Sequence, residues 1–160
     1  QLKPVTGRMD AVIIANRPLV VVDYAHTPDA LEKALSTLQE IKHTGKLFCV
    51  FGCGGNRDRG KRPQMGRIAA ELADEVIITT DNPRDEEPLQ IIHDITTNLT
   101  SSNYQVIVDR AEAIRAALAA AKAGDIVLVA GKGHETYQEI HGVKHHFSDF
   151  ELVNEILQVN

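Results

Sequence analysis

The sequence predicts an α/β fold, a Rossmann-like, doubly wound and mostly parallel sheet flanked by helices, with a C-terminal β-hairpin. Two observations lead to this fold class. Several short runs are rich in β-branched residues and almost continuously apolar, as in strands that are buried on both faces. Stretches with helical spacing of apolar residues separate them, and regular alternation of strand and helix gives a parallel sheet. The clear strand runs are Leu19–Val22, Leu47–Phe51, Val76–Thr79 and Ile126–Val129.

Weaker signals complete the sheet and add two hairpins. Gln105–Val108 has the composition of a fifth strand and the expected spacing from its neighbours. Val12–Ala15 is separated from the first clear run by Asn16-Arg17-Pro18, so these segments are expected to pair as an N-terminal hairpin. The stretch 136–147 turns at His141-Gly142, which predicts the C-terminal hairpin.

Five segments are expected to be helical. The first has Thr27 as N-cap and Pro28 at the first helical position, and its apolar stripe runs to Ile41. The others are Met65–Ala73, Ile91–Leu99, Ala113–Ala121 and Phe150–Leu157. Pairs that resemble capping boxes precede the last two, namely Asp109 with Glu112 and Ser148 with Glu151.

Composition sets the class of protein. The chain has 160 residues and 43% hydrophobic content, enough for one domain with its own core. A net charge of -5, no Trp, three Tyr and four Phe argue against nucleic-acid binding. No apolar run reaches the roughly 18 residues of a membrane span. Cys49 and Cys53 fit neither a disulfide framework nor a zinc site, which indicates a reducing compartment. Because the chain begins with Gln1, we expect residues 1–160 to be one domain of a longer protein.

Polar, glycine-rich segments follow four of the expected strands. Ligands of open α/β sheets bind beyond the carboxyl ends of the strands, so these segments are expected to share one site. They are Asp23-Tyr24-Ala25-His26, Gly52-Cys53-Gly54-Gly55-Asn56-Arg57-Asp58, Asp81-Asn82-Pro83-Arg84 and Gly131-Lys132-Gly133-His134-Glu135.

The second of these segments fits neither of two common nucleotide motifs. From Gly55 to Lys61 it matches the start of the phosphate-loop pattern G-x-x-x-x-G-K, but Arg62 stands where Ser or Thr would hold magnesium. Arg57 replaces the third glycine of the dinucleotide pattern G-x-G-x-x-G. We therefore interpret the segment as a loop whose backbone approaches some other ligand closely.

Two arginines at this edge suit an anionic ligand. Arg84 follows Asn82-Pro83, which favours an extended, rigid turn and holds the arginine on a fixed corner. A guanidinium group donates two parallel charge-assisted bonds to a carboxylate or phosphate. Arg57 has the same chemistry, although its charged neighbours fit a solvated surface arginine equally well.

The last loop and the histidines can be explained without a ligand or a metal ion. Gly131-Lys132-Gly133 permits close approach to a ligand or forms a turn into the hairpin, and Glu135 suits an ammonium group. His141, His145 and His146 have no carboxylate or cysteine at ligand spacing, and a strand would place the last two on opposite faces, so no metal site is expected. Cys53 is interpreted as a packing residue, although a nearby helix N-terminus would lower its pKa.

Five motifs, in order along the chain, resemble the C-terminal domain of the Mur ligase family. They are Gly7-Arg8-Met9, Asp23-Tyr24-Ala25-His26-Thr27-Pro28-Asp29, Phe51-Gly52-Cys53-Gly54-Gly55-Asn56-Arg57-Asp58, Asp81-Asn82-Pro83-Arg84 and Gly131-Lys132-Gly133-His134-Glu135. The resemblance covers essentially the whole chain and is strongest to the branch that adds meso-diaminopimelate. It implies two further domains on the full-length protein, an N-terminal one that binds the UDP-sugar and a central one with the phosphate loop and magnesium sites.

The resemblance also implies an activity. ATP converts the carboxylate of the UDP-muramoyl-dipeptide into an acyl phosphate, and the amine of diaminopimelate attacks it to give an amide, ADP and phosphate. It implies a cytoplasmic, monomeric bacterial ligase of peptidoglycan synthesis that uses ATP and Mg²⁺ when full-length. The domain alone carries no phosphate loop, so it is expected to be inactive and to bind no cofactor, nucleic acid or membrane.

Residue roles follow from the matching motif positions. The implied contacts to diaminopimelate are Arg57, Asp81, Asn82, Pro83, Arg84, Gly131 and Glu135, and the implied contacts to the nucleotide are Arg8, Asp23 and His26. No catalytic residue and no metal ligand is assigned. Diaminopimelate differs from lysine by a distal carboxylate, which suits Arg84, and its distal ammonium group suits Glu135.

Two alternatives stay open on the sequence. One is a ligase of the same architecture that adds lysine or glutamate, although the lysine-adding relatives lack an arginine at the position of Arg84. The other is a non-catalytic Rossmann-like module that binds a nucleotide or another small ligand.

Overall fold

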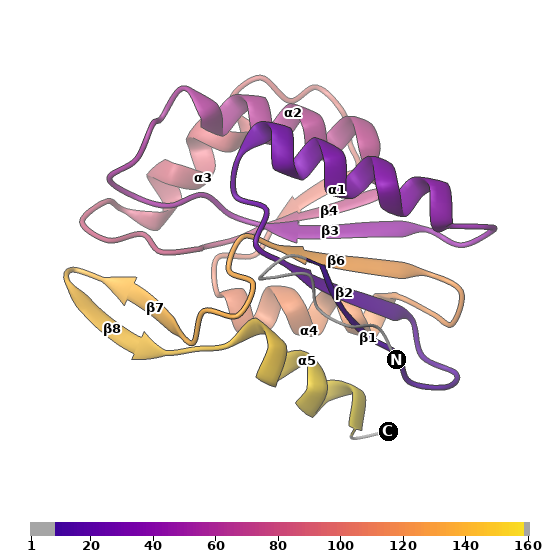
Figure 1. The fold of residues 1–160 in the computed structure, drawn as a ribbon. Helices are drawn as coiled ribbons and strands as arrows, with labels where there is room; N and C mark the ends of the chain where they lie inside the picture. Colours follow the sequence, from indigo (N-terminus) through magenta and orange to yellow (C-terminus); the bar gives the residue numbers. More distant parts are fainter. Residues whose placement is uncertain (1–8, 159–160) are drawn as a thin grey trace.

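The computed structural model describes residues 9–158 and contains one six-stranded sheet (Figure 1). The strand order is β1-β2-β6-β3-β4-β5, with β1 antiparallel to β2 and all other neighbours parallel. The strands are β1 (Asp10–Val12), β2 (Leu19–Asp23), β3 (Leu47–Phe51), β4 (Glu75–Ile78), β5 (Tyr104–Val106) and β6 (Ile126–Ala130). The predicted parallel sheet and N-terminal hairpin are confirmed, with strand ends shifted by a few residues.

Helices cover both faces of the sheet, as the continuous apolar runs require. Figure 1 shows α1 (Pro28–Ile41), α2 (Lys61–Leu72) and α3 (Pro88–Thr96) on one face, and α4 (Arg110–Ala120) and α5 (Asp149–Gln158) on the other. Alternate residues of one strand enter different cores: Val21 packs with the first group of helices, whereas Val20 and Val22 pack with the second.

The helix starts only partly follow the predicted capping. Thr27 Oγ1 accepts a hydrogen bond from the Ala30 N–H, and Ser148 Oγ accepts one from the Glu151 N–H, as expected. Asp109 is the N-cap of α4, but its side chain makes no capping bond, so the predicted capping box at that helix is wrong. The third helix ends at Thr96 rather than at Leu99, which lies in a turn beyond it.

The C-terminal hairpin is confirmed and touches the sheet's carboxyl edge. Strands β7 (Tyr137–Ile140) and β8 (Val143–His146) pair antiparallel across a turn in which His141 and Gly142 both have positive φ. A single parallel bridge joins Ile140 to Arg84, in the loop after β4. The hairpin therefore forms one wall of the edge where the four polar loops gather.

Sheet order brings the polar loops together. Strand β6 lies between β2 and β3, and it leads through the hairpin to α5 on one face of the sheet, whereas β2 and β3 lead to α1 and α2 on the other face. Such a switch point opens a crevice at the carboxyl ends of the strands. Between residues 9 and 158, no helix is long and apolar enough to cross a membrane.

Candidate functional site

The glycine-rich loop after β3 packs tightly against the loop after β4. Gly55 N–H donates to the Asn82 carbonyl at 2.7 Å. A Cβ atom on Gly55 would collide with the Pro83 carbonyl, and one on Gly52 would collide with the Thr79 carbonyl. The sequence prediction of close backbone approach is confirmed, but these two glycines approach a neighbouring loop and not an open ligand space.

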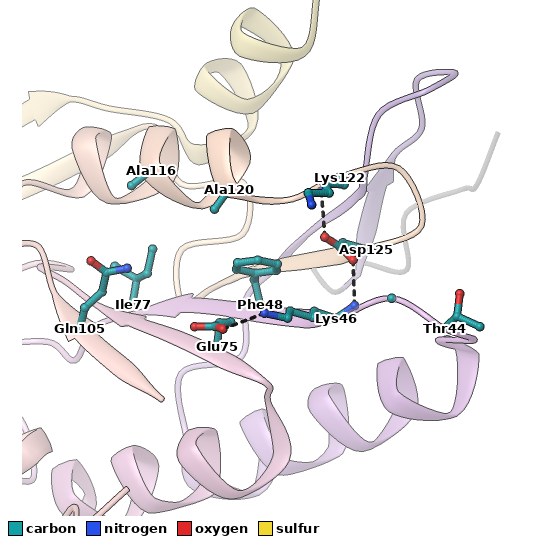
Figure 2. A pocket seen from close by; sticks show the side chains of 11 residues that line it. Thr44, Lys46, Phe48, Glu75, Ile77, Gln105, Ala116, Ala120, Lys122 and Asp125 are labelled. Carbon is teal, nitrogen blue, oxygen red and sulfur yellow. Dashed lines mark hydrogen bonds and ion pairs between the residues drawn. The ribbon is translucent and has the colours of Figure 1, made fainter. Parts of the chain in front are cut away.

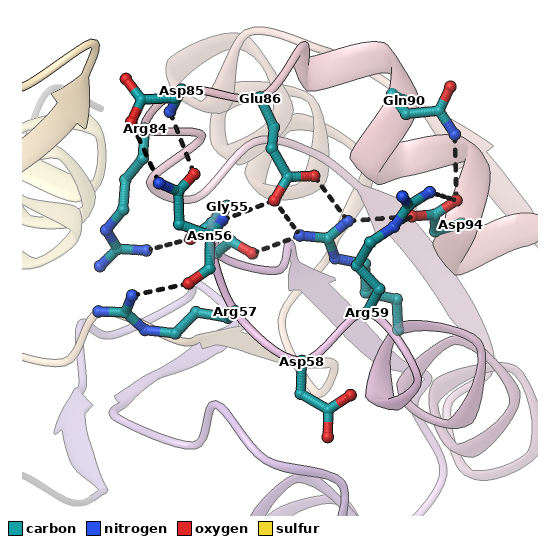
Figure 3. A network of polar contacts seen from close by, with 12 residues as sticks. Gly55, Asn56, Arg57, Asp58, Arg59, Arg84, Asp85, Glu86, Gln90 and Asp94 are labelled. Carbon is teal, nitrogen blue, oxygen red and sulfur yellow. Dashed lines mark hydrogen bonds and ion pairs between the residues drawn. The ribbon is translucent and has the colours of Figure 1, made fainter.

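Arg57 and Arg84 lie on the same side of the glycine-rich loop (Figure 3). A Cβ atom on Gly54 would meet Arg84 Nη1 at 2.7 Å and Arg57 Cγ at 3.6 Å, so this glycine lets both arginines lie against the backbone. Arg84 Nη1 donates to the Gly55 carbonyl at 2.9 Å, and Arg57 Nη1 donates to the Asn56 carbonyl at 3.0 Å. For the part of the chain that the structure describes, neither Nη2 atom has a protein partner.

Arg84 is held by the C-terminal hairpin as well as by the loop. Its Nε lies 3.3 Å from Glu139 Oε1, and its backbone N–H donates to the Glu139 carbonyl at 3.0 Å. The residue has a positive φ of 53°, which is uncommon for a side chain other than Gly, Asn or Asp. The predicted rigid corner is therefore supported from both sides, and sequence reasoning missed Glu139 because it lies 55 residues further along the chain.

Asn82 is buried, at 4% exposure, and its amide orientation is fixed. Its Oδ1 accepts hydrogen bonds from Lys132 Nζ at 2.8 Å and from the Glu139 N–H at 2.9 Å. Both partners only donate, so the oxygen faces them and the Nδ2 hydrogens face the other way. No described residue accepts a bond from Nδ2, which leaves two donors without a protein partner on the loop that also carries Arg84.

Lys132 is wholly buried and ties three segments together. Besides Asn82, its Nζ donates to the Tyr137 carbonyl at 2.8 Å, and it lies 3.3 Å from Asp81 Oδ1 and 3.7 Å from Glu135 Oε1. Gly131 has a φ of +121°, and a Cβ there would lie 2.6 Å from Asp81 Oδ2. The glycine thus makes room for the carboxylate that the lysine holds.

A buried ion pair supports this cluster from behind. Arg110 donates to both carboxylate oxygens of Asp149 at 2.8 Å, and to the Thr80 and Ala130 carbonyls at 3.1 and 3.0 Å. Burial opposes the charged form, but the field of Asp149 outweighs it and raises the pKa of Arg110. The pair links α4 and α5 to the ends of β4 and β6, and sequence patterns gave no sign of it.

A second network fixes the outer side of the glycine-rich loop (Figure 3). Arg62 donates to both oxygens of Glu86 at 3.0 Å, to Asp94 at 2.9 Å and to the Gly54 carbonyl at 2.9 Å. Hydrogen bonds from Arg62 lower the pKa of Glu86, and those from Arg59 lower the pKa of Asp94. Arg62, which stands where a phosphate loop would have Ser or Thr, therefore holds the glycine-rich loop against Glu86 and Asp94.

The loop after β2 lines a separate hollow of about 410 Å³. Asp23, Tyr24 and His26 contribute to it, together with Lys33 and Thr37 of α1. The Tyr24 and His26 rings meet edge to face, with centroids 4.6 Å apart. Gly131 and Gly133 N–H groups donate to the Asp23 carbonyl, which joins this loop to the loop after β6. Arg8 lies outside the described residues.

Another hollow, of about 360 Å³, lies at the opposite end of the sheet (Figure 2). Its polar groups are engaged with one another: Asp125 accepts the Lys46 and Lys122 backbone N–H groups at 2.8 Å each, and Lys46 Nζ pairs with Glu75 at 3.2 Å. These contacts close the turns at the amino ends of the strands, so we assign no ligand there.

Among the described residues, neither Cys53 nor the histidines of the C-terminal hairpin are arranged as a reactive or metal-binding group. Burial, followed by the field of Asp81, raises the pKa of Cys53 to about 12, and its Sγ lies 3.8 Å from Met65 Sδ. The prediction of a packing residue is confirmed. His145 and His146 are consecutive in β8 and so face opposite ways. Within residues 9–158, no group of histidines, cysteines and carboxylates is placed to hold a metal ion.

An open, mostly parallel sheet whose carboxyl-end loops carry polar and charged side chains is the arrangement found in α/β domains that bind small molecules. Comparison with known proteins makes the class specific. The sequence model described as "Mur ligase, glutamate ligase domain" matches residues 7–133, and the chain belongs to this family.

Individual relatives agree with the family. The chain is 60% identical over 158 residues to a UDP-N-acetylmuramoyl-L-alanyl-D-glutamate--2,6-diaminopimelate ligase of Neisseria meningitidis serogroup A, covering 98% of this chain and 32% of the relative. A solved structure of a ligase with the same name has a TM-score of 0.90 and 48% identity, with 98% and 32% coverage. The chain thus spans about a third of the length of the curated relatives it matches.

A more distant solved structure shares the fold. It is a bifunctional folylpolyglutamate synthase/dihydrofolate synthase with Mn, AMPPNP and L-glutamate bound, at a TM-score of 0.61 and 24% identity. It covers 80% of this chain and 29% of that one. At this identity the likeness concerns the fold alone.

Proposed function

We propose that this chain is the amino-acid-binding domain of an ATP-dependent ligase that adds meso-diaminopimelate to UDP-N-acetylmuramoyl-L-alanyl-D-glutamate in bacterial peptidoglycan synthesis. The single observation that carries the proposal is that Asn82 Nδ2 and Arg84 Nη2, two donors of one loop, have no partner among the described residues. Each needs an acceptor, and a carboxylate supplies two oxygens in one plane.

The distal carboxylate of diaminopimelate is the group that fits these donors. Asn82 and Arg84 are tied into one rigid edge through Glu139 and the glycine-rich loop, so they are oriented before a ligand arrives. Arg57 lies against the same glycine and adds a second guanidinium group. Preorganised donors bind a carboxylate with less loss of side-chain freedom than mobile ones do.

The distal ammonium group is accepted on the other side of the loop. Asp81 is buried, whereas Glu135 is partly exposed and lies across Lys132 from it. Glu135 therefore presents the accessible acceptor, with Gly131 providing the close backbone approach. An ammonium group and a carboxylate on the same carbon, met by Glu135 and by Asn82 with Arg84, distinguish diaminopimelate from lysine and from glutamate.

The hollow beside Asp23 and His26 takes part of the nucleotide. Exposed aromatic rings of Tyr24 and His26 suit contact with a base or ribose, and Lys33 adds a positive charge. The described loops contain no magnesium-binding hydroxyl of a phosphate loop, so the triphosphate and Mg²⁺ belong to another part of the full-length protein. Relatives about three times as long as this chain are consistent with two further domains.

In this proposal the domain positions the substrate, and the groups that activate the acyl carbon lie on other parts of the full-length protein. Its residues hold the attacking amine at near-attack distance from an acyl phosphate formed elsewhere, and bring one wall of the nucleotide site with them. A monomeric cytoplasmic enzyme accounts for two thiols without a disulfide.

The test is a ligation assay with the full-length protein, offering diaminopimelate, lysine and glutamate separately and in competition. Diaminopimelate is expected to be used at least about tenfold more efficiently than either, because lysine lacks the distal carboxylate and glutamate lacks the distal ammonium group, so each leaves part of the site unpaired. Preference for lysine or glutamate would overturn the substrate assignment. Calorimetric titration of this chain with NAD tests the non-catalytic alternative, and tight binding would favour that module.

A further inference from the structure

Lys132 is a charged side chain with no solvent exposure and no free face toward a ligand. Its Nζ contacts Asn82, Asp81, Glu135 and the Tyr137 carbonyl, all within 3.7 Å. Burying an ammonium group is costly unless it is paired and hydrogen-bonded, and here both conditions are met. Three of its four partners are residues that the proposed function places in the substrate site.

Lys132 determines whether the side-chain amide of Asn82 presents its oxygen or its Nδ2 hydrogens to a ligand. A free primary amide presents an acceptor or two donors equally well, according to how its side chain is rotated. Lys132 Nζ and the Glu139 N–H both donate to Oδ1, so rotation of the amide would bring Nδ2 hydrogens against two donors. The amide is thereby locked with its Nδ2 donors facing away from Lys132 Nζ and the Glu139 N–H.

The lysine also balances the carboxylates that share the site. Asp81 is almost fully buried and Glu135 is partly so, and Lys132 lies between them. Without this charge, two carboxylates would face each other and would oppose a ligand that brings a third. Buried Arg110 is already matched by Asp149 and does not replace it.

We propose that Lys132 is a positioning residue that sets the specificity of the site for a substrate carboxylate, by fixing Asn82 as a donor. The inference rests on the proposed function and deepens it. Lys132 does not touch the substrate; it acts through Asn82, and through the placement of Asp81 and Glu135.

The primary experiment is Lys132→Met in the full-length protein, with steady-state kinetics for each substrate. The KM for diaminopimelate is expected to rise about 10- to 100-fold, because hydrogen bonds to a charged group carry roughly 1.5–3 kcal/mol. The KM for the UDP-peptide is expected to stay within about twofold of its usual value, since that substrate lies outside these contacts. The ratio of kcat/KM for diaminopimelate over lysine is expected to fall about tenfold or more.

Lys144→Met is the matched control. Lys144 is an exposed lysine on β8, and its Nζ lies 4.5 Å from the centroid of the Tyr137 ring that Lys132 also approaches, at 5.7 Å. This substitution removes one lysine from the hairpin that Lys132 contacts at Tyr137, and it leaves the contacts of Asn82 unchanged. All three kinetic quantities are expected to stay within about twofold, since exposed charges contribute little.

A double-mutant cycle with Asn82→Ala separates positioning from general structural damage. If Lys132 acts through Asn82, Lys132→Met adds less than about threefold to the loss of diaminopimelate use once Asn82 is alanine. Fully additive losses, or a diaminopimelate-to-lysine ratio unchanged by Lys132→Met, would overturn the inference. Should Lys132→Met not fold, Lys132→Gln replaces it, with a smaller fall in the same ratio expected and an unchanged ratio counting against the proposal.

Different results would overturn the proposed ligase function and the positioning role of Lys132. An unmodified full-length protein that does not ligate diaminopimelate overturns the proposed function, and with it the role of Lys132. An unmodified protein that uses diaminopimelate normally, with a ratio that Lys132→Met leaves unmoved, overturns only the positioning role.

Discussion

Two arginines donate to consecutive carbonyls of the glycine-rich loop and have opposite surroundings. Arg62 donates to the Gly54 carbonyl and Arg84 to the Gly55 carbonyl, each at 2.9 Å. The Arg62 side chain is 1% exposed and meets two carboxylates, whereas that of Arg84 is 18% exposed and meets one, through Nε alone. Arg62 therefore fits a structural role, whereas Arg84 keeps a donor without a protein partner, as its proposed role in substrate binding requires.

The comparison shows that pairing, more than residue type, separates a structural arginine from a binding one. The Arg62 network has its carboxylates on protein side chains, and their lowered pKa values show how strongly they are held in the charged form. Around Arg84, the unfilled positions are Arg84 Nη2 and Asn82 Nδ2, both donors. Substitutions in the two networks should therefore have opposite signatures, with stability affected in one and substrate use in the other.

The largest effect is expected for Arg84→Ala in the full-length protein. The kcat/KM for diaminopimelate should fall about 100-fold, or about 2.7 kcal/mol, because a charge-assisted bond to the substrate is lost. The KM of the UDP-peptide should change little. Steady-state kinetics with each substrate varied in turn provides the measurement, and normal use of diaminopimelate by the variant would show that Arg84 has no such role.

Arg62→Met should lower the stability of the protein and change the use of diaminopimelate much less than Arg84→Ala does. The free energy of unfolding is expected to fall by about 2–3 kcal/mol, since Glu86 and Asp94 keep their charges and lose the hydrogen bonds that Arg62 donates. Urea denaturation of the variant and the unmodified protein measures this difference. Use of diaminopimelate should fall less than about tenfold, because the loop shifts but Arg84 remains. A variant as stable as the parent would mean that the Arg62 network carries no net stability.

The pH dependence of stability sharpens the same contrast. The folded pKa values of Glu86 and Asp94 are lowered, so their contribution is fully present above about pH 5 and is lost as the pH falls through 4 and below. The difference in unfolding free energy between the parent and Arg62→Met should therefore shrink between about pH 5 and pH 3. Denaturation curves across this range test it, and a constant difference would count against carboxylate pairing as the cause.

The last prediction concerns Cys53, on the loop between the two networks, and involves no change in stability or substrate use. Because burial raises the pKa of its thiol to about 12, almost none is thiolate at pH 8. Alkylation of the native protein by iodoacetamide should be slower than that of an unfolded sample by about 100-fold or more. Equal rates would show that the loop opens readily and that Arg62 does not hold it closed.

Much of the fold was predictable because the signals were local. Continuous apolar runs gave the five parallel strands within a few residues, and Thr27 and Ser148 gave two helix starts. The third helix was predicted too long because Leu99, although at the right spacing, packs from a turn. Asp109 sits at the N-cap position of α4, but its side-chain oxygens accept no capping hydrogen bond, which composition alone does not reveal.

The loops that form the candidate site were predictable from the sequence, but the side-chain contacts that hold these loops together were not. Sequence order identifies which residues follow each strand, and sheet geometry then brings Asn82, Arg84 and Glu135 to one edge. The contacts of Lys132, Glu139 and Arg110 depend on distant pairings between loops, hairpin and helices, which spacing does not encode. Lys132 itself stood between two glycines, and only its burial showed that it faces inward.

The most direct test of the carboxylate-binding edge is Asn82→Asp in the full-length protein, assayed with diaminopimelate and lysine in competition. Aspartate keeps Oδ1 for Lys132 and Glu139 and replaces only the Nδ2 donors, adding a negative charge. The ratio of kcat/KM for diaminopimelate over lysine is predicted to fall by about 30-fold or more, because the distal carboxylate would meet an acceptor. A ratio within about twofold of the unmodified protein would contradict the account.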